Sequence, residues 1–230
     1  MAGEDGRPTG RRRPGPTTER GLDRVVNFSD AVVAIAITLI ILPLVDLAQE
    51  HDDGSVVAFF GHNWTGLAAA ALSFVVIANF WRDHHRLFER TVGYSTRLVT
   101  LNFVWLAGIV FLPLPTVLLF DGTGDDRGAP TLYIATMLVS MVAVRLQQVV
   151  VERDGLLSEE AAAAARRPWP LVWFPTGLML LAGVLAATVP GLGAQALYLL
   201  LLSLPIGWIS GRRHRDAPST SSGTGEPSGP

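Results

Sequence analysis

The chain has 230 residues, of which 49% are hydrophobic, with a mean hydropathy of +0.36 and a formal net charge of −2. This composition is too apolar for an ordinary soluble domain, and several long apolar runs indicate an integral membrane protein. The lack of cysteine excludes disulfides and thiolate metal sites. No nucleic-acid partner and no cofactor are expected.

Both ends of the chain have low-complexity sequences. Residues 1–20 are rich in Gly, Pro and Arg, and residues 212–230 are rich in Ser, Gly and Pro. Such compositions cannot bury enough apolar surface to order a segment. We predict two disordered tails flanking one transmembrane domain over residues 21–211.

The first apolar stretch covers residues 24–47, and between Ala31 and Val45 its only polar side chain is Thr38. Its length suits a helix of about 20 residues that crosses a bilayer core of about 30 Å. Its first turns nevertheless carry Arg24, Asn27, Ser29 and Asp30. An acid near the membrane marks a candidate functional site.

A helical wheel separates this helix into faces. At about 100° per residue, six positions with spacings of three and four form one narrow stripe: Arg24, Phe28, Ala31, Ile35, Thr38 and Leu42. Asp30 lies about 140° away from Ile35. If several copies surrounded an axis, this stripe would line a narrow apolar channel, and Ser29 and Asp30 would face neighbouring helices. An ordinary packed helix with one buried polar cluster fits the wheel as well.

Five further apolar runs predict a total of six transmembrane helices, and hence an all-α membrane fold. The runs cover residues 56–81, 98–120, 130–151, 171–189 and 192–209. The third helix ends in Leu-Pro-Leu-Pro-Thr at residues 112–116, where proline disrupts the last turn. Prolines also punctuate the fifth and sixth runs, so short or kinked helices are expected there.

The arginines predict the orientation of the chain. With six spans both termini lie on one side, and seventeen of the eighteen arginines share that side, leaving only Arg127 opposite. The opposite loops carry most of the acidic loop residues, including Asp52 and Asp125. The positive-inside rule therefore places both termini in the cytoplasm.

A polar segment closes the second helix, at residues 81–88 (Trp-Arg-Asp-His-His-Arg-Leu-Phe). Adjacent histidines diverge on a helix, and no further ligand completes a set of three or four, so we predict no metal site. Two readings stay open. The segment is a polar helix end beside lipid headgroups, or His84 or His85 joins Ser29 or Asp30 and Asn102 in a hydrogen-bonded lock.

The pattern R-x-x-x-F-S-D-A-V-x-A-I-A-x-T-L, from Arg24 to Leu39, resembles the first helix of the transmembrane-protein-175 family. These proteins are lysosomal potassium channels and their single-repeat prokaryotic relatives. The resemblance extends over residues 24–116. It implies a homotetramer with the first helix of each subunit around the pore. It also implies that a histidine of the W-x-x-H segment and polar or aromatic residues of the third helix hold the first helix through the Ser29–Asp30 pair. Spacing from Trp81 favours His84 as that histidine. Trp105 could pack against the first helix.

Together these features predict a passive potassium-permeable channel in the cell membrane of a prokaryote. Narrow apolar rings can gate by dewetting, so Ile35 and Leu42 are expected to form hydrophobic constrictions and Thr38 a ring of hydroxyls. The structural network is expected to comprise Arg24, Phe28, Ser29, Asp30, His84, His85 and Asn102. Membrane lipids and three further copies of the chain are the expected partners.

Two other functions remain open from sequence. Asp30 and a nearby histidine could form the relay of a proton-coupled transporter or a proton-permeable channel. A small membrane scaffold, in which the polar cluster only fixes helix packing, would carry no flux at all. The sequence contains no P-loop and no nucleophile or zinc-protease motif, so an enzyme is not expected.

Overall fold

A computed structural model describes residues 19–49, 55–121 and 128–164, together with 176–178, 180, 181, 184 and 188. Within these ranges the regular structure is helical, apart from one isolated β-bridge. Four helical stretches are long and apolar enough to cross a membrane: Arg20–Gln49, Trp64–Phe88, Thr96–Leu119 and Gly128–Arg153. The all-α class is confirmed. The expected sixth span lies outside the described residues, and the expected fifth span is described only at residues 176–178, 180, 181, 184 and 188.

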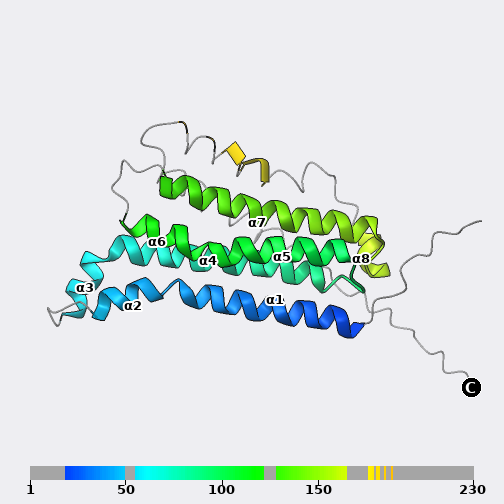
Figure 1. Ribbon diagram of the computed structural model, residues 1–230, viewed down its shortest axis with the longest axis horizontal. Helices are drawn as coiled ribbons and strands as arrows, with labels where there is room; N and C mark the ends of the chain where they lie inside the picture. The colour runs from blue at the N-terminus through cyan, green and yellow to red at the C-terminus, as the bar shows by residue number, and fades with distance from the viewer. Residues whose placement is uncertain are drawn as a thin grey trace, which may run out of the picture.

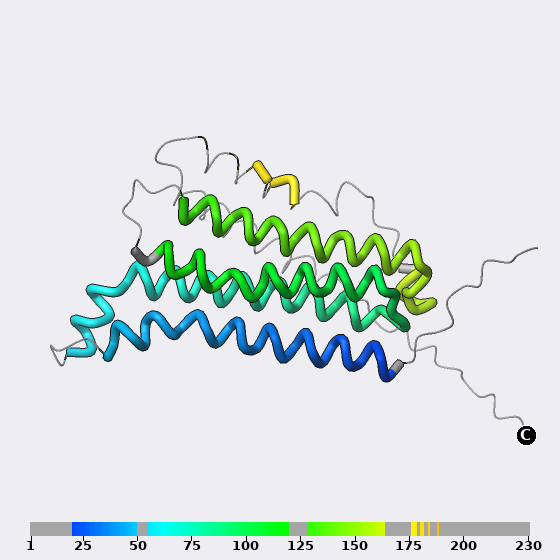
Figure 2. The backbone as a smooth tube through the Cα atoms, viewed as in Figure 1, coloured from blue at the N-terminus to red at the C-terminus, as the bar shows by residue number. Residues whose placement is uncertain are grey.

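The helices run along one common axis and form an elongated bundle (Figures 1 and 2). α1 (Glu19–Leu39) and α2 (Leu42–Gln49) lie on one side of it, and α7 (Gly128–Arg153) lies on the other. The layer between them consists of α4 (Trp64–Phe88), α5 (Thr96–Phe111) and α6 (Pro113–Asp121). α1 contacts α4, α5 and α6. Its other side therefore faces away from the described core.

Three of the expected spans are interrupted, and of these the sequence predicted a disruption only in the third, at residues 112–116. The first span breaks at Ile40 and Ile41, because Pro43 has no N–H to bond the carbonyl of Leu39. The third span breaks at Leu112 for the same reason, with Pro113 opening α6. The second run is divided at Asn63 into α3 (Val56–His62) and α4.

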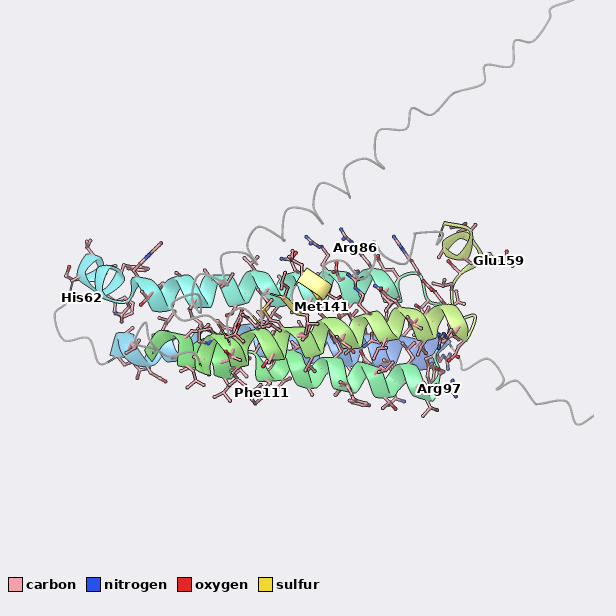
Figure 3. The ribbon with its side chains drawn as sticks, turned by 90° about the horizontal axis from the view of Figure 1, so that it is seen from above. His62, Arg86, Arg97, Phe111, Met141 and Glu159 are labelled. Atoms are coloured by element: carbon pink, nitrogen blue, oxygen red, sulfur yellow. The ribbon has the colours of Figure 1, made fainter. Side chains whose placement is uncertain are left out.

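Labelled polar residues mark the two ends of the bundle (Figure 3). Arg97 and Glu159 lie at one end, and His62 lies at the other. At the first of these ends the chain turns after α7 through Gly155, whose φ of +64° favours glycine. The turn pairs Thr91 with Leu157 in the isolated bridge and leads into α8 (Glu159–Ala164). The segment after α4 is thereby tied to the segment after α7.

Candidate functional site

The predicted stripe of α1 and α2 is exposed along its whole length in the single subunit. Phe28 is 51% exposed, Ile35 60% and Leu42 49%, whereas Val33 and Ala36 on the opposite face are buried. Large apolar side chains in this state indicate a surface that another apolar surface or lipid covers. The stripe is thus an unpartnered apolar face, interrupted by the Thr38 hydroxyl.

The break in the first span lies within this stripe. Thr38 donates its hydroxyl hydrogen to the carbonyl of Ile35 at 2.7 Å, while the backbone bond from Ile41 to Thr38 is 3.4 Å long. Leu44 and Val45 then bond the carbonyl of Ile41 to start the next helix. Leu42 consequently belongs to α2, and a wheel drawn through a single helix does not determine its direction. Its exposure nevertheless keeps it on the open face.

Behind the stripe, Ser29, Asn102 and His84 join three helices by hydrogen bonds, and each of the three is at most 1% exposed. The amide Nδ2 of Asn102 donates to Ser29 Oγ at 2.8 Å. Ser29 in turn donates to the carbonyl of Val25 at 2.8 Å. Asn102 Oδ1 lies 2.7 Å from Nε2 of His84. Because Oδ1 can only accept, Nε2 of His84 carries the hydrogen.

The imidazole of His84 is held between two aromatic rings. Its centroid lies 4.0 Å from that of Trp105, with an interplanar angle of 11°, and 4.4 Å from that of Phe88, with an angle of 30°. Trp105 is fully buried. The stacking restricts the tilt of the His84 imidazole, and the hydrogen bond to Asn102 fixes the direction in which its Nε2 points. His84 therefore has a single orientation. His84, the histidine that spacing favours, therefore reaches Ser29 through Asn102.

Asp30 has a different partner from the one expected. The sequence suggested that His84 or His85 together with Asn102 would satisfy its carboxylate, but Oδ1 accepts from Nε1 of Trp81 at 2.8 Å. His85 stacks on Trp81, with centroids 5.0 Å apart, and its Nε2 lies 3.2 Å from Glu89 Oε1. This second polar group is far more exposed than the first. Trp81 was identified only as a marker of the segment, although indole N–H is an obvious donor to an acid.

Arg24 and Phe28 line a cavity of about 180 Å³ between α1 and α5. The Phe28 ring meets that of Phe103 edge-on, with centroids 6.0 Å apart, and Asn102 forms part of the lining. These two residues of the motif therefore lie beside the buried network. Within the described ranges, no three His, Cys, Asp or Glu side chains group as metal ligands do.

Comparison with known proteins finds a family model that matches the first three spans and relatives that match more than half of the chain. Residues 24–113 match the family model described as endosomal/lysosomal potassium channel TMEM175. A potassium channel of Streptomyces collinus is 33% identical over 123 residues, which cover 54% of this chain and 58% of that protein. A potassium channel of Chamaesiphon minutus is 30% identical over 142 residues, which cover 60% of this chain and 70% of that one.

More distant matches extend to animals and to a solved structure. A human protein named endosomal/lysosomal proton channel TMEM175 is 25% identical over 147 residues, 63% of this chain but 29% of that one. The crystal structure of a lysosomal potassium-selective channel TMEM175 homolog from Chamaesiphon minutus superposes with a TM-score of 0.62 at 23% identity. It covers 82% of this chain and 98% of that chain, so the fold is shared. The chain belongs to the TMEM175 family, a family of channels rather than enzymes.

Proposed function

We propose that this protein is a potassium-permeable cation channel whose pore is formed by the first helices of a homotetramer. The observation that carries the proposal is the exposed stripe. A single subunit leaves Phe28, Ile35 and Leu42 uncovered along one line, and symmetric copies around an axis would enclose that line. The two prokaryotic relatives described above, both named potassium channels, support potassium as the permeant ion.

In this proposal Ile35 and Leu42 form apolar rings and Thr38 forms a ring of hydroxyl oxygens between them. Apolar rings resist hydrated ions and can gate by dewetting. Since the Thr38 hydroxyl hydrogen is bound to the carbonyl of Ile35, the oxygen lone pairs remain free to face a cation. A partly dehydrated ion would meet acceptors, not donors, at this level. Arg24, Phe28, Ser29, Asp30, His84, His85 and Asn102 form the structural network that holds the helix.

The proposed topology has six spans over residues 21–211 between two cytoplasmic tails, in the cell membrane of a prokaryote. The four helices of membrane-spanning length account for the first four of these spans. The distribution of arginines supports cytoplasmic termini. α1 begins at Glu19, so the helix starts two residues inside the segment assigned to the first tail.

Proton conduction is the second candidate, because the human relative is named a proton channel. The exposed group of Asp30, Trp81, His85 and Glu89 contains the titratable side chains that proton transfer needs. Protein reconstituted in liposomes distinguishes the candidates. Potassium flux with no change in the signal of an internal pH-sensitive dye supports the potassium channel. A change in internal pH under a pH gradient, without potassium flux, supports the proton channel. No flux of either ion would indicate a scaffold.

Substitutions in the stripe test the pore directly. Ile35→Asn replaces an apolar ring with amides that retain water, so conductance should rise and the preference for potassium over sodium should weaken. Thr38→Val keeps the shape but removes the oxygens, so the preference should weaken without a rise in conductance. Ala36→Ser is the control, since Ala36 is buried and lies about 100° from Ile35 and further from Thr38. Equal effects at Ala36 and Ile35 would place the pore elsewhere.

A further inference from the structure

Three buried hydroxyls, of Ser73, Thr116 and Tyr133, join α4, α6 and α7, and we call them the hydroxyl chain. It is separate from the hydrogen bonds of Ser29, Asn102 and His84. Ser73 Oγ lies 2.8 Å from Thr116 Oγ1 and 3.1 Å from the hydroxyl of Tyr133. All three residues are at most 1% exposed. Buried hydroxyls in a membrane-spanning bundle are costly unless paired, so their meeting at one point indicates a specific role.

The direction of each bond in this chain follows from its last member. Thr116 Oγ1 donates to the carbonyl of Leu112 at 2.8 Å, so it must accept from Ser73. Ser73 then has no hydrogen left for Tyr133, and the tyrosine hydroxyl donates to Ser73. The hydrogen bonds therefore run one way, from α7 through α4 to the carbonyl of Leu112.

Leu112 is the residue at which the third span breaks. Pro113 has no N–H, and the backbone bonds around the break are long: Leu112 to the carbonyl of Ile109 and Thr116 to that of Leu112 are both 3.3 Å. The side-chain bond of Thr116 to Leu112 is much shorter. Because helix breaks leave backbone groups with weak partners, side chains determine their geometry. The hydroxyl chain thus ties the carbonyl of Leu112, where α5 ends and α6 begins, to α4 and α7.

The position of α6 bears on the proposed pore. α6 contacts α1. Ile40, in the break of the first span, and Leu44, just after it, share one buried cluster with Leu112. We propose that the Tyr133–Ser73–Thr116 chain positions α6 and, through it, the break that separates Thr38 from Leu42. This positioning role rests on the proposed function, since it would place the constriction residues. None of the three hydroxyls touches the stripe.

Two hydroxyl deletions test the role. Tyr133→Phe and Thr116→Val keep the side-chain volume but remove one hydroxyl of the hydroxyl chain. Thr116→Ser keeps the hydroxyl that Thr116→Val removes. Thr136→Val is the matched control, because Thr136 is also buried on α7 but bonds only the carbonyl of Leu132 in its own helix. We expect both deletions to lower the potassium-to-sodium permeability ratio by roughly twofold to tenfold, the range that one lost net hydrogen bond produces in an equilibrium. Thr116→Ser and Thr136→Val should keep the wild-type ratio.

A second measurement does not depend on conduction. Because the protein lacks cysteine, spin labels attach only at introduced cysteines. We choose Ile41→Cys in the break of the first span and Leu118→Cys on α6. Labelled subunits are diluted among unlabelled ones so that only distances within one subunit are measured. Tyr133→Phe should broaden or shift the distance distribution between the labels, and Thr136→Val should not. Unchanged distances would overturn the positioning role, as would a wild-type permeability ratio in both deletions of a conducting channel. If the wild-type protein carries no potassium current, the proposed function fails and the distances alone decide the positioning.

Discussion

The hydrogen bond between Asn102 and Ser29 links α5 to α1 across 73 residues of sequence, and its loss should weaken the bundle measurably. Asn102→Ala removes the donor to Ser29 and the acceptor for His84 Nε2, which is buried between two rings. Ser29→Ala removes only one partner. A buried group left without its partner costs about 1–3 kcal/mol. Asn102→Ala should therefore lower the free energy of unfolding more than Ser29→Ala does, because it also leaves His84 Nε2 without its partner.

The energy of the bond itself is obtained from the double variant. Between transmembrane helices the coupling of hydrogen-bonded pairs averages about 0.6 kcal/mol and reaches about 1.7 kcal/mol, because the unfolded chain in the membrane also finds partners. We expect a coupling in this range from reversible unfolding in mixed micelles with increasing dodecyl sulfate. Thr100→Ala on α5 is the control, since its exposed hydroxyl bonds only the carbonyl of Thr96. A coupling near zero, with equal losses in both single variants, would refute the direct bond.

Two further substitutions have outcomes that the geometry predicts. Gly108→Ala would bring a Cβ against Ser140 Oγ, so the Ser140 hydroxyl must rotate away from its bond to the carbonyl of Thr136, and the loss should be about that of one hydrogen bond, about 0.5–1.5 kcal/mol. In a Ser140→Ala background the same change should cost little, and an unaffected single variant would contradict the contact. Trp81→Phe removes the donor to Asp30 but keeps a ring to stack on His85. The melting temperature should fall less than for Asn102→Ala because this pair is exposed, and a larger fall would contradict that ranking.

Periodicity grouped the residues of the stripe on the first span, although the wheel fitted an ordinary packed helix as well. The wheel grouped Phe28, Ile35 and Thr38 on one side, and the structure leaves all three exposed. The reason is that burial of an amphipathic helix follows its side-chain period, which is a local property of the sequence. The first four spans followed from length and apolar character in the same way. The start of the fourth span differs by two residues, since α7 begins at Gly128 rather than at residue 130, but the second span covers Trp64–Phe88 rather than residues 56–81.

The breaks within the spans were harder to predict, although the prolines are visible in the sequence. Pro43 and Pro113 each release a carbonyl on the preceding turn, but hydropathy averages over the break and reads one helix. Asn63 gives an even weaker signal. It ends α3 and precedes α4 with no proline nearby, and its side chain bonds the carbonyl of Phe59. Sequence patterns therefore located the spans better than the changes of direction within them.

The partners of polar residues could not be predicted from spacing along one helix. Ser29 and Asp30 are neighbours in sequence, yet they bond residues on different helices, Asn102 and Trp81. The choice depends on the rotation of three helices about their axes, which no single helical wheel contains. The hydroxyl chain of Tyr133 was not identified because its members lie in three separate spans and form no motif.

The polar contacts of α1 explain why its open face is the stripe and no other. In a membrane the apolar sides of a helix are nearly equivalent, because lipid chains and neighbouring leucines offer similar surroundings. Apolar packing alone would therefore leave the rotation of α1 weakly determined. Ser29 and Asp30, about 100° apart on the helix, bond α5 and α4 respectively, and two such contacts leave one rotation. A turn of one residue would direct Thr38 towards a neighbouring helix, so the buried network determines which oxygens a permeant ion would meet.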